Sequence, residues 1–167
     1  MEIIDSSPSA GEAGKGFKVV IDYAHTPDSL ELVYKTLRNE LNNSSIYSTG
    51  VQGGERNRMR RCLVCVLGAA GGGRDKWKRP EFGRIAAQYC DEIILTNEDP
   101  YDENPDAIFK QIERAFLQAK VPKPKSQKIL DRKEAIKTAL ALAKDGDVVI
   151  LTGKGSETSM AVAGDQK

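Results

Sequence analysis

The sequence predicts an α/β fold, a doubly wound and mostly parallel sheet with helices on both faces. Three observations support this prediction. Short apolar runs alternate with amphipathic segments in a repeated strand–helix order. Several of these runs are apolar throughout, as strands buried on both faces are. Polar and glycine-rich motifs follow the runs directly, at the strand ends where such sheets bind ligands. The expected architecture is therefore Rossmann-like.

The expected elements follow one another with short connections. The strands are expected at residues 17–22, 62–67, 91–96, 128–130 and 147–151, with a final short strand at 160–163. The helices are expected at residues 27–41, 80–89 and 105–119, and from the N-cap Asp131 to Gly146. Helical spacing places apolar residues on one face of each helix, as with Leu30, Val33, Leu37 and Leu41. The alternation of strands and helices favours parallel pairing.

Length and composition indicate one domain over residues 1–167, with 40% apolar and 29% charged residues. Residues 42–61 are expected to form a long exposed or disordered loop. The formal net charge of +1 gives no general attraction to nucleic acid or membranes. The arginine cluster at 56–61 is only a weak sign of nucleic-acid contact, because it is short and lacks interleaved aromatic residues. No apolar run reaches the roughly 20 residues of a membrane span.

The cysteines and the N-terminal residues favour a reduced, cytoplasmic compartment. Cys62 and Cys65 form a C-x-x-C motif inside a predicted strand, where their separation points the two side chains to opposite faces. Neither a thioredoxin-like motif nor a zinc half-site is therefore expected, and no metal site is predicted. Residues 1–5 have neither the basic nor the apolar character of a secretion signal.

The most informative stretch lies at residues 64–80, where an apolar strand runs into three glycines and a charged segment. Gly71, Gly72 and Gly73 have no Cβ, so an anion can approach their backbone N–H groups. Arg74, Asp75, Lys76, Lys78 and Arg79 follow, and Pro80 suits the first turn of a helix. The pattern predicts an anion site. The alternative is a tight turn with a solvated basic face.

Four motifs together resemble one family. The segment 22–31, Asp-Tyr-Ala-His-Thr-Pro-Asp-Ser-Leu-Glu, resembles the start of the C-terminal domain of Mur ligases. Residues 71–80, 97–100 and 153–157 resemble that family's glycine-rich, Asp-Asn-Pro and Gly-Lys-Gly-His-Glu loops, in the same order. The resemblance covers roughly residues 1–163. It is closest to the UDP-N-acetylmuramoyl-L-alanyl-D-glutamate:diamino-acid ligases (the MurE type), which add the third amino acid of the peptidoglycan stem peptide.

The resemblance implies ATP-dependent amide formation through an acyl phosphate. The family's enzymes have three domains, and the central one carries the P-loop and the magnesium ligands. This sequence has no G-x-x-x-x-G-K-[ST] motif, because residues 11–16 lack its spacing and its final Ser/Thr. ATP and Mg are therefore expected to serve the full-length enzyme. This domain alone is expected to hold no catalytic residue, to bind neither cofactor tightly and to be inactive. Relatives continue into another helix, so the chain is expected to be truncated at its C-terminus.

The resemblance also assigns site residues. Asp22 and His25 are expected to contact ATP. Arg74 is expected to bind the carboxylate of the added amino acid, for which a guanidinium is well suited. Gly153 and Glu157 are expected to hold the distal part of that amino acid. The alternatives are a helix-capping role for Asp22, a packed loop position for His25 and a glycine-rich turn around Gly153.

The loop at residues 97–101 departs from the family pattern. Diaminopimelate-adding enzymes have Asp-Asn-Pro-Arg there, whereas this chain has Glu98-Asp99-Pro100-Tyr101. Glu98, Asp99 and Tyr101 are expected to contact the amino acid. Without the arginine, a second substrate carboxylate would meet like charges. We therefore expect a lysine- or ornithine-like or neutral amino acid, beside ATP and UDP-MurNAc-dipeptide, as the partners of the full enzyme. The alternative is a stand-alone nucleotide- or amino-acid-binding regulatory module.

Overall fold

The computed structural model describes residues 2–5, 16–43, 60–73, 75–118, 124–154 and 160–162. Its described strands form one six-stranded sheet in the order β1-β2-β6-β3-β4-β5. They are β1 (Glu2–Asp5), β2 (Lys18–Asp22), β3 (Leu63–Leu67), β4 (Glu92–Leu95), β5 (Lys125–Lys128) and β6 (Val148–Thr152). All neighbours pair in parallel except β1, which is antiparallel to β2. The prediction of an α/β fold with a mostly parallel sheet is confirmed.

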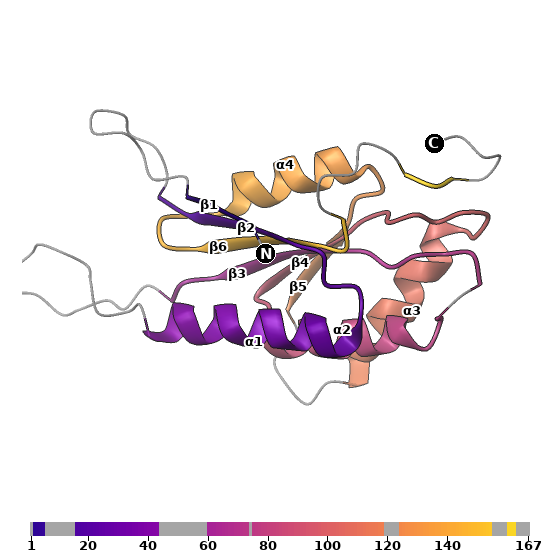
Figure 1. Ribbon diagram of the computed structural model, residues 1–167, viewed down its shortest axis with the longest axis horizontal. Coiled ribbons are helices and arrows are strands. Elements are labelled where there is room, and N and C mark those ends of the chain that lie inside the picture. The colour runs from indigo at the N-terminus through magenta and orange to yellow at the C-terminus, as the bar shows by residue number, and fades with distance from the viewer. Residues whose placement is uncertain are drawn as a thin grey trace, which may run out of the picture.

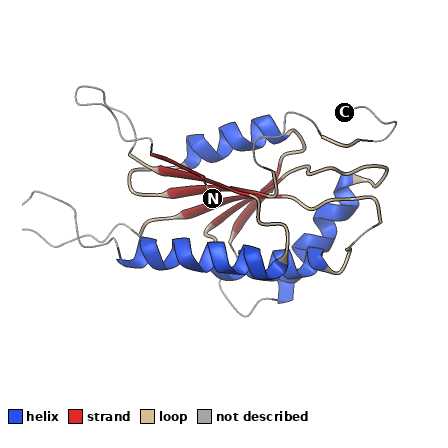
Figure 2. Ribbon diagram, in the orientation of Figure 1, coloured by secondary structure: helices blue, strands red, loops and turns tan. Residues whose placement is uncertain are grey.

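Helices cover both faces of the sheet (Figures 1 and 2). Three of them, α1 (Pro27–Asn43), α2 (Lys78–Tyr89) and α3 (Pro105–Gln118), lie on one face, and α4 (Arg132–Leu142) lies on the other. The chain moves in one direction from β2 through β3 and β4 to β5, then returns to place β6 between β2 and β3. Because crossovers keep one hand, the return places its helix on the opposite face. This reversal creates a switch point beside β6.

The core follows the alternation of side chains along the central strands. All five residues of β3 and of β6 are buried, which explains why both sequences are apolar almost throughout. In β3, Leu63, Cys65 and Leu67 pack beneath α1 to α3, while Val64 and Val66 pack beneath α4. The predicted apolar face of α1 is also buried, including Leu30, Val33, Leu37 and Leu41. Hydrophobic burial on both faces of the sheet therefore fixes the frame that carries the loops.

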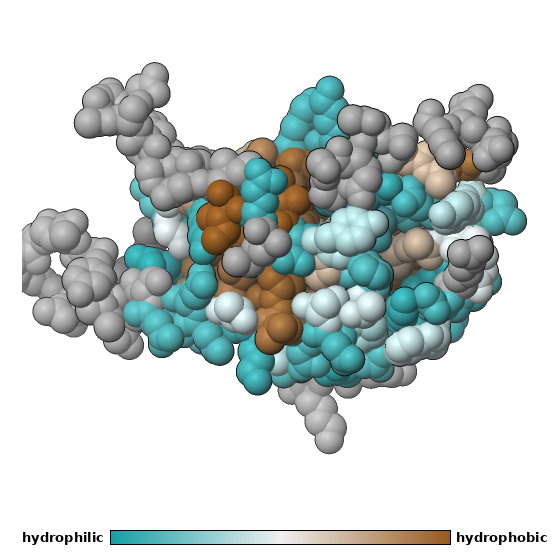
Figure 3. Space-filling model, in the orientation of Figure 1, coloured by the Kyte–Doolittle hydropathy of each residue, from teal (hydrophilic) through white to brown (hydrophobic). Residues whose placement is uncertain are grey.

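The prediction was weakest at the edges of the sheet. Sequence analysis missed β1, and the strand expected at 128–130 lies instead at Lys125–Lys128. The four residues of β5 are polar and exposed, so they lack the apolar pattern that marks a central strand. Figure 3 shows apolar atoms gathered where β1 and β2 lie, and Ile3 on β1 is 47% exposed. The strand expected at 160–163 is a single bridge between Tyr101 and Val162.

The loop expected at residues 42–61 begins later than predicted, because α1 continues to Asn43. Its residues 44–59 lie outside the described part of the chain. Arg60, at its end, forms an ion pair with Asp91 at 2.9 Å. No described helix has the length and the apolar character that crossing a membrane requires.

The sequence favours a reduced compartment, whereas two of the three cysteines are paired in the structure. Cys65 in β3 forms a disulfide with Cys90, which directly follows α2, whereas Cys62 is free. The two paired residues are 0% and 6% exposed, so sequence patterns show them only as core positions. The C-x-x-C motif itself does not pair, as predicted. The disulfide joins the ends of the segment that contains the glycine-rich motif and α2.

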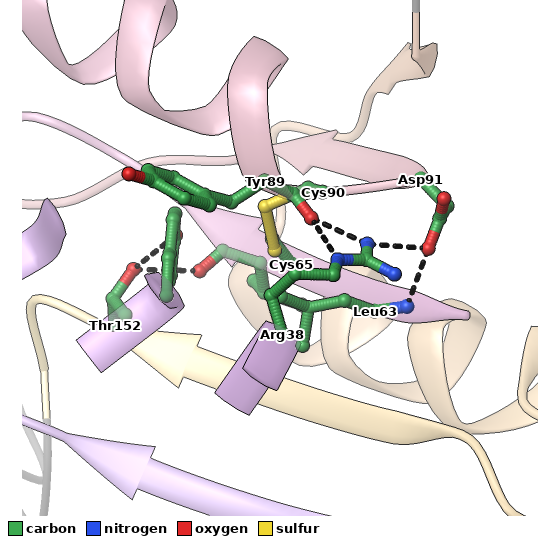
Figure 4. The surroundings of a disulfide bond; sticks show 9 residues. Arg38, Leu63, Cys65, Tyr89, Cys90, Asp91 and Thr152 are labelled. Atoms are coloured by element: carbon green, nitrogen blue, oxygen red, sulfur yellow. Dashed lines mark hydrogen bonds and ion pairs between the residues drawn. A yellow bond between two sulfur atoms is a disulfide. The ribbon is translucent and has the colours of Figure 1, made fainter. Parts of the chain in front are cut away.

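A polar network lies beside the disulfide (Figure 4). The Arg38 guanidinium donates to the Tyr89 carbonyl oxygen and lies 2.6 Å from an Asp91 carboxylate oxygen. The same Asp91 oxygen accepts a hydrogen bond from the Leu63 backbone N–H at 2.8 Å. These contacts join α1, the C-terminal end of α2 and the start of β3. They connect these elements at the amino-terminal end of β3, whereas the motif-bearing loops lie at the opposite, carboxyl-terminal ends of the strands.

Candidate functional site

The described parts of four motif-bearing loops lie at the carboxyl ends of β2, β6, β3 and β4, as the sequence predicts. We call residues 68–77, after β3, the glycine loop and residues 96–104, after β4, the acidic loop. The Gly71 N–H donates to the Asp99 carbonyl oxygen at 2.9 Å, which joins these two loops. The Tyr101 N–H donates to the Ala161 carbonyl oxygen at 3.0 Å. The acidic loop is therefore joined to the glycine loop and to Ala161 at the carboxyl-terminal end of the sheet.

Asp99 connects three segments of the chain. One of its carboxylate oxygens accepts from the Ala161 N–H at 2.7 Å, and the other lies 2.9 Å from the Lys154 ammonium. Its carbonyl oxygen accepts from Gly71, as described above. Its φ of +42° lies in the left-handed region, which costs energy for a residue with a Cβ. Asp99 is thus committed to contacts that hold the site together.

Glu98 is the buried carboxyl of the site, with an exposed fraction of 9%. It lies between the ends of β3 and β6. A Cβ on Gly153 would fall 2.0 Å from Glu98 Oε2, and a Cβ on Gly68 would fall 2.7 Å from the Glu98 Cβ. Glycine at both strand ends therefore leaves the space that this side chain fills. Gly153 also has a φ of +86°, which favours glycine independently.

The surroundings of Glu98 shift its acidity toward neutrality. Burial raises the pKa of its carboxyl from 4.5 to about 7, and the neighbouring Asp99 adds to the rise. Positive charges on Arg132 and Lys154, and His25, oppose the shift. The carboxyl is consequently close to half ionised at neutral pH. A cationic group brought beside it would favour the ionised form, so the position suits recognition of an ammonium.

Sequence analysis missed a group of residues that interacts electrostatically with Glu98 through Arg132 and Tyr34. Arg132, the first residue of α4, donates to the Thr152 carbonyl oxygen at 2.9 Å. Tyr34 of α1 donates to the Thr152 hydroxyl at 3.2 Å, and that hydroxyl donates to the Val66 carbonyl oxygen at 3.1 Å. Burial raises the pKa of the Tyr34 hydroxyl well above its usual value. Their positions in the sequence could have indicated two of these residues, because Thr152 ends β6 and Arg132 follows the cap residue of α4.

Asp22 and His25 lie at the end of β2, next to the end of β6 in the sheet register. Asp22 Oδ1 accepts from the Ala24 N–H at 2.9 Å, and His25 Nδ1 donates to the Tyr23 carbonyl oxygen at 3.0 Å. The helix cap comes from Thr26, whose hydroxyl accepts from the Ser29 N–H at 3.3 Å. Thr26 thus holds the cap position of α1, the role that the alternative gave to Asp22.

The glycine loop surrounds a carboxylate of the chain itself. Glu103 of the acidic loop accepts from the Gly73 N–H at 2.6 Å and from both terminal nitrogens of Arg79 at 3.0 Å. Lys76 lies 3.4 Å from the same carboxylate. Arg79, one of the charged residues of the predicted anion site, is 1% exposed and orders the loop, so it is not part of a solvated basic face. The anion at this turn is thus Glu103.

Besides Asp22 and His25, the predicted site residues divide into two groups. Glu98, Asp99, Tyr101 and Gly153 lie together at the junction of the loops. Tyr101 is 49% exposed, and its ring packs against Gly72, where a Cβ would fall 3.2 Å from the ring. Arg74 and Glu157, for which carboxylate and distal-amine contacts are predicted, lie outside the described residues.

Comparisons with known proteins agree with the predicted resemblance. Residues 9–155 match the family described as "Mur ligase, glutamate ligase domain". The chain is 40% identical over 151 residues to the UDP-N-acetylmuramoyl-L-alanyl-D-glutamate–2,6-diaminopimelate ligase of Syntrophomonas wolfei, covering 90% of this chain and 27% of that protein. It is 42% identical over 147 residues to the ligase of the same name from Caldanaerobacter subterraneus, covering 88% of this chain and 26% of that protein.

A solved structure shows the same arrangement. A UDP-N-acetylmuramoyl-L-alanyl-D-glutamate–2,6-diaminopimelate ligase superposes with a TM-score of 0.72 at 30% sequence identity, covering 97% of this chain and 27% of that chain. The chain therefore spans about a quarter of the length of these relatives.

Proposed function

We propose a specific role for this chain within a Mur ligase, because it belongs to the family described as the glutamate ligase domain of these enzymes. It forms the amino-acid-binding wall and one side of the ATP site in an enzyme that adds the third stem-peptide residue to UDP-N-acetylmuramoyl-L-Ala-D-Glu. The family match over residues 9–155 and the names of the relatives support the ligase assignment. The convergence of the four loops supports the role at the site.

The proposed reaction divides between this domain and the rest of the enzyme. ATP phosphorylates the substrate carboxylate, and the amine of the incoming amino acid attacks the acyl phosphate and displaces phosphate. In this scheme Asp22 and His25 face the nucleotide, and the glycine and acidic loops hold the amino acid. Among the described residues, no three His, Cys, Asp or Glu side chains gather to hold a metal. As the family resemblance implies, we assign the magnesium ligands and the P-loop to the central domain of the enzyme.

The buried carboxyl of Glu98 is the single observation that carries the proposal for the amino-acid subsite. Its pKa of about 7 leaves it poised between its two charge states. An ammonium on the incoming amino acid would pair with the ionised form and offset part of the cost of burying it. The glycines at positions 68 and 153 leave the room that this carboxyl occupies. Glu98 is thus proposed to recognise a cationic group of the substrate.

The proposed amino acid differs from the one in the relatives' names. Those proteins are named for 2,6-diaminopimelate, which has a carboxylate at each end. In this chain the acidic loop carries Tyr101 where the diaminopimelate-adding pattern has arginine, and Glu98 and Asp99 precede it. A second substrate carboxylate would meet these like charges. A lysine- or ornithine-like amino acid, or a neutral one, fits this loop better.

Steady-state kinetics of the full-length protein that carries this domain test the role of Glu98. With ATP, Mg and UDP-MurNAc-dipeptide held saturating, Glu98→Gln is expected to raise the KM for a cationic amino acid by about 10- to 100-fold. The KM for ATP should change little. Glu92→Gln, at the start of β4, the strand that precedes the acidic loop, is the matched control and should behave as wild type. Equal effects of both variants, or an unchanged amino-acid KM in Glu98→Gln, would refute the subsite. Binding without any turnover would favour the regulatory module.

A further inference from the structure

We propose that Glu103 is a positioning residue: its carboxylate occupies a built anion site and holds the glycine loop against the acidic loop. Donors from three places converge on this one group. The Gly73 N–H approaches one oxygen at 2.6 Å, the Arg79 guanidinium spans both oxygens at 3.0 Å, and Lys76 lies 3.4 Å away. This assignment does not depend on which substrate the domain binds.

The Arg79 guanidinium requires an anion at this place. Its side chain is 1% exposed, and it also donates to the Ala70 carbonyl oxygen and to the Gln111 side chain, both at 2.9 Å. Removing a charge from water is costly unless an opposite charge and hydrogen bonds replace the solvent. Glu103 supplies both, in the two-point geometry that a guanidinium favours. The interaction in turn holds the pKa of the Glu103 carboxyl at about 2.

The backbone of the glycine and acidic loops is strained near the contact between Glu103 and Arg79. The loops therefore need a strong contact to keep this conformation. Asp75, Asp99 and Tyr101 all have φ between +42° and +53°, a region that residues with a Cβ enter at a cost. Within the described part of the chain, the two loops are also joined by the Gly71 hydrogen bond to Asp99 and by the packing of Gly71 and Gly72 on Pro100 and Tyr101. The charged contact through Glu103 therefore offsets the strain and sets where the glycine loop lies.

Chemical rescue tests this assignment in the chain as it stands. Glu103→Ala removes the carboxylate and leaves the donors in place. Acetate is then added at increasing concentration, with sodium chloride at matched ionic strength as the comparison. Two readouts are local: the exchange of the Gly73 amide, followed by NMR, and the fluorescence of Trp77, the single tryptophan, which is 63% exposed beside Lys76. Asp102→Ala removes the neighbouring acidic residue and serves as the matched control.

The expected result is that Glu103→Ala exchanges its Gly73 amide about 10- to 100-fold faster than wild type and shifts the Trp77 emission. Acetate restores both readouts in a saturable manner and chloride does not, while Asp102→Ala behaves as wild type. The proposal is overturned if Glu103→Ala matches wild type in both readouts, or if acetate does no more than chloride.

A second variant covers the case in which Glu103→Ala does not fold. Glu103→Gln keeps the shape and one acceptor for Gly73 but removes the charge that Arg79 needs. Its Gly73 amide should exchange faster than in wild type, and acetate should have no effect because the amide fills the site. Exchange equal to wild type in this variant would contradict the proposal.

Discussion

At the scale of single residues, the burial of Glu98, for which we propose a role in substrate binding, works against stability. A carboxyl whose pKa is raised in the folded state binds its proton more tightly there than in the unfolded chain. Ionising it therefore favours unfolding. Below its ordinary pKa of 4.5 the group is protonated in both states and has no effect. Between that value and about 7 its contribution to stability falls as the pH rises.

The first prediction concerns this pH dependence. Glu98→Gln should be more stable than wild type at pH 8, by up to about 3 kcal/mol, and the difference should vanish toward pH 4. Urea unfolding at a series of pH values measures it. The facing charges on Arg132, Lys154, Asp99 and His25 remain in both proteins. Glu92→Gln is the control and should keep the wild-type pH dependence. A stability difference that is constant across this pH range would contradict the assigned burial of Glu98.

At the scale of elements, sequence analysis correctly predicted the helices and strands whose residues face a hydrophobic core. The helix faces and the central strands have clear periodicity, and their apolar residues are buried as expected. The edge strands β1 and β5 depend on pairing with a neighbour, which leaves little pattern in four residues. The disulfide was missed because Cys65 and Cys90 lie 25 residues apart, and because burial is equally expected of a reduced cysteine.

The second prediction concerns the contact between α2 and α3. A Cβ on Gly83 would fall 2.0 Å from the Ile112 carbonyl oxygen, a backbone atom that cannot move aside without moving α3. Gly83→Ala should therefore destabilise the fold by about 2 kcal/mol, although alanine favours helix by about 1 kcal/mol. Urea unfolding measures the change. Gly16→Ala, where no atom lies within 4 Å, is the control and should change little. Stabilisation by Gly83→Ala would show that the helices are not packed this closely.

The third prediction concerns the disulfide. Replacing Cys65 and Cys90 together by alanine should lower the free energy of unfolding by about 3 kcal/mol, because the bond closes a loop of the order of 25 residues. A reducing agent should lower the melting temperature of wild type and leave that of the double variant unchanged. Cys62→Ser changes the free cysteine and should keep the wild-type sensitivity to the reductant. If reduction leaves the melting temperature of wild type unaltered, the bond contributes nothing to stability.

At the scale of the whole molecule, topology builds the candidate site. The placement of β6 between β2 and β3 puts the four motif-bearing strand ends side by side. This convergence could be predicted from the strand–helix order. The burial of Glu98 and the capture of Glu103 by Arg79 could not, because they depend on which side chains meet between loops far apart in sequence. Sequence patterns identify the loops, whereas packing decides which charges are buried and paired.

A comparison of amino-acid substrates tests most directly whether Glu98 and Tyr101 form a subsite for a cation. The full-length protein that carries this domain is given ATP, Mg, UDP-MurNAc-dipeptide and either L-lysine, L-ornithine or meso-diaminopimelate, and kcat/KM is measured for each. We predict a preference of roughly 100-fold or more for a cationic amino acid over meso-diaminopimelate, since the second carboxylate would be buried without a partner. A preference for meso-diaminopimelate would contradict the proposed subsite.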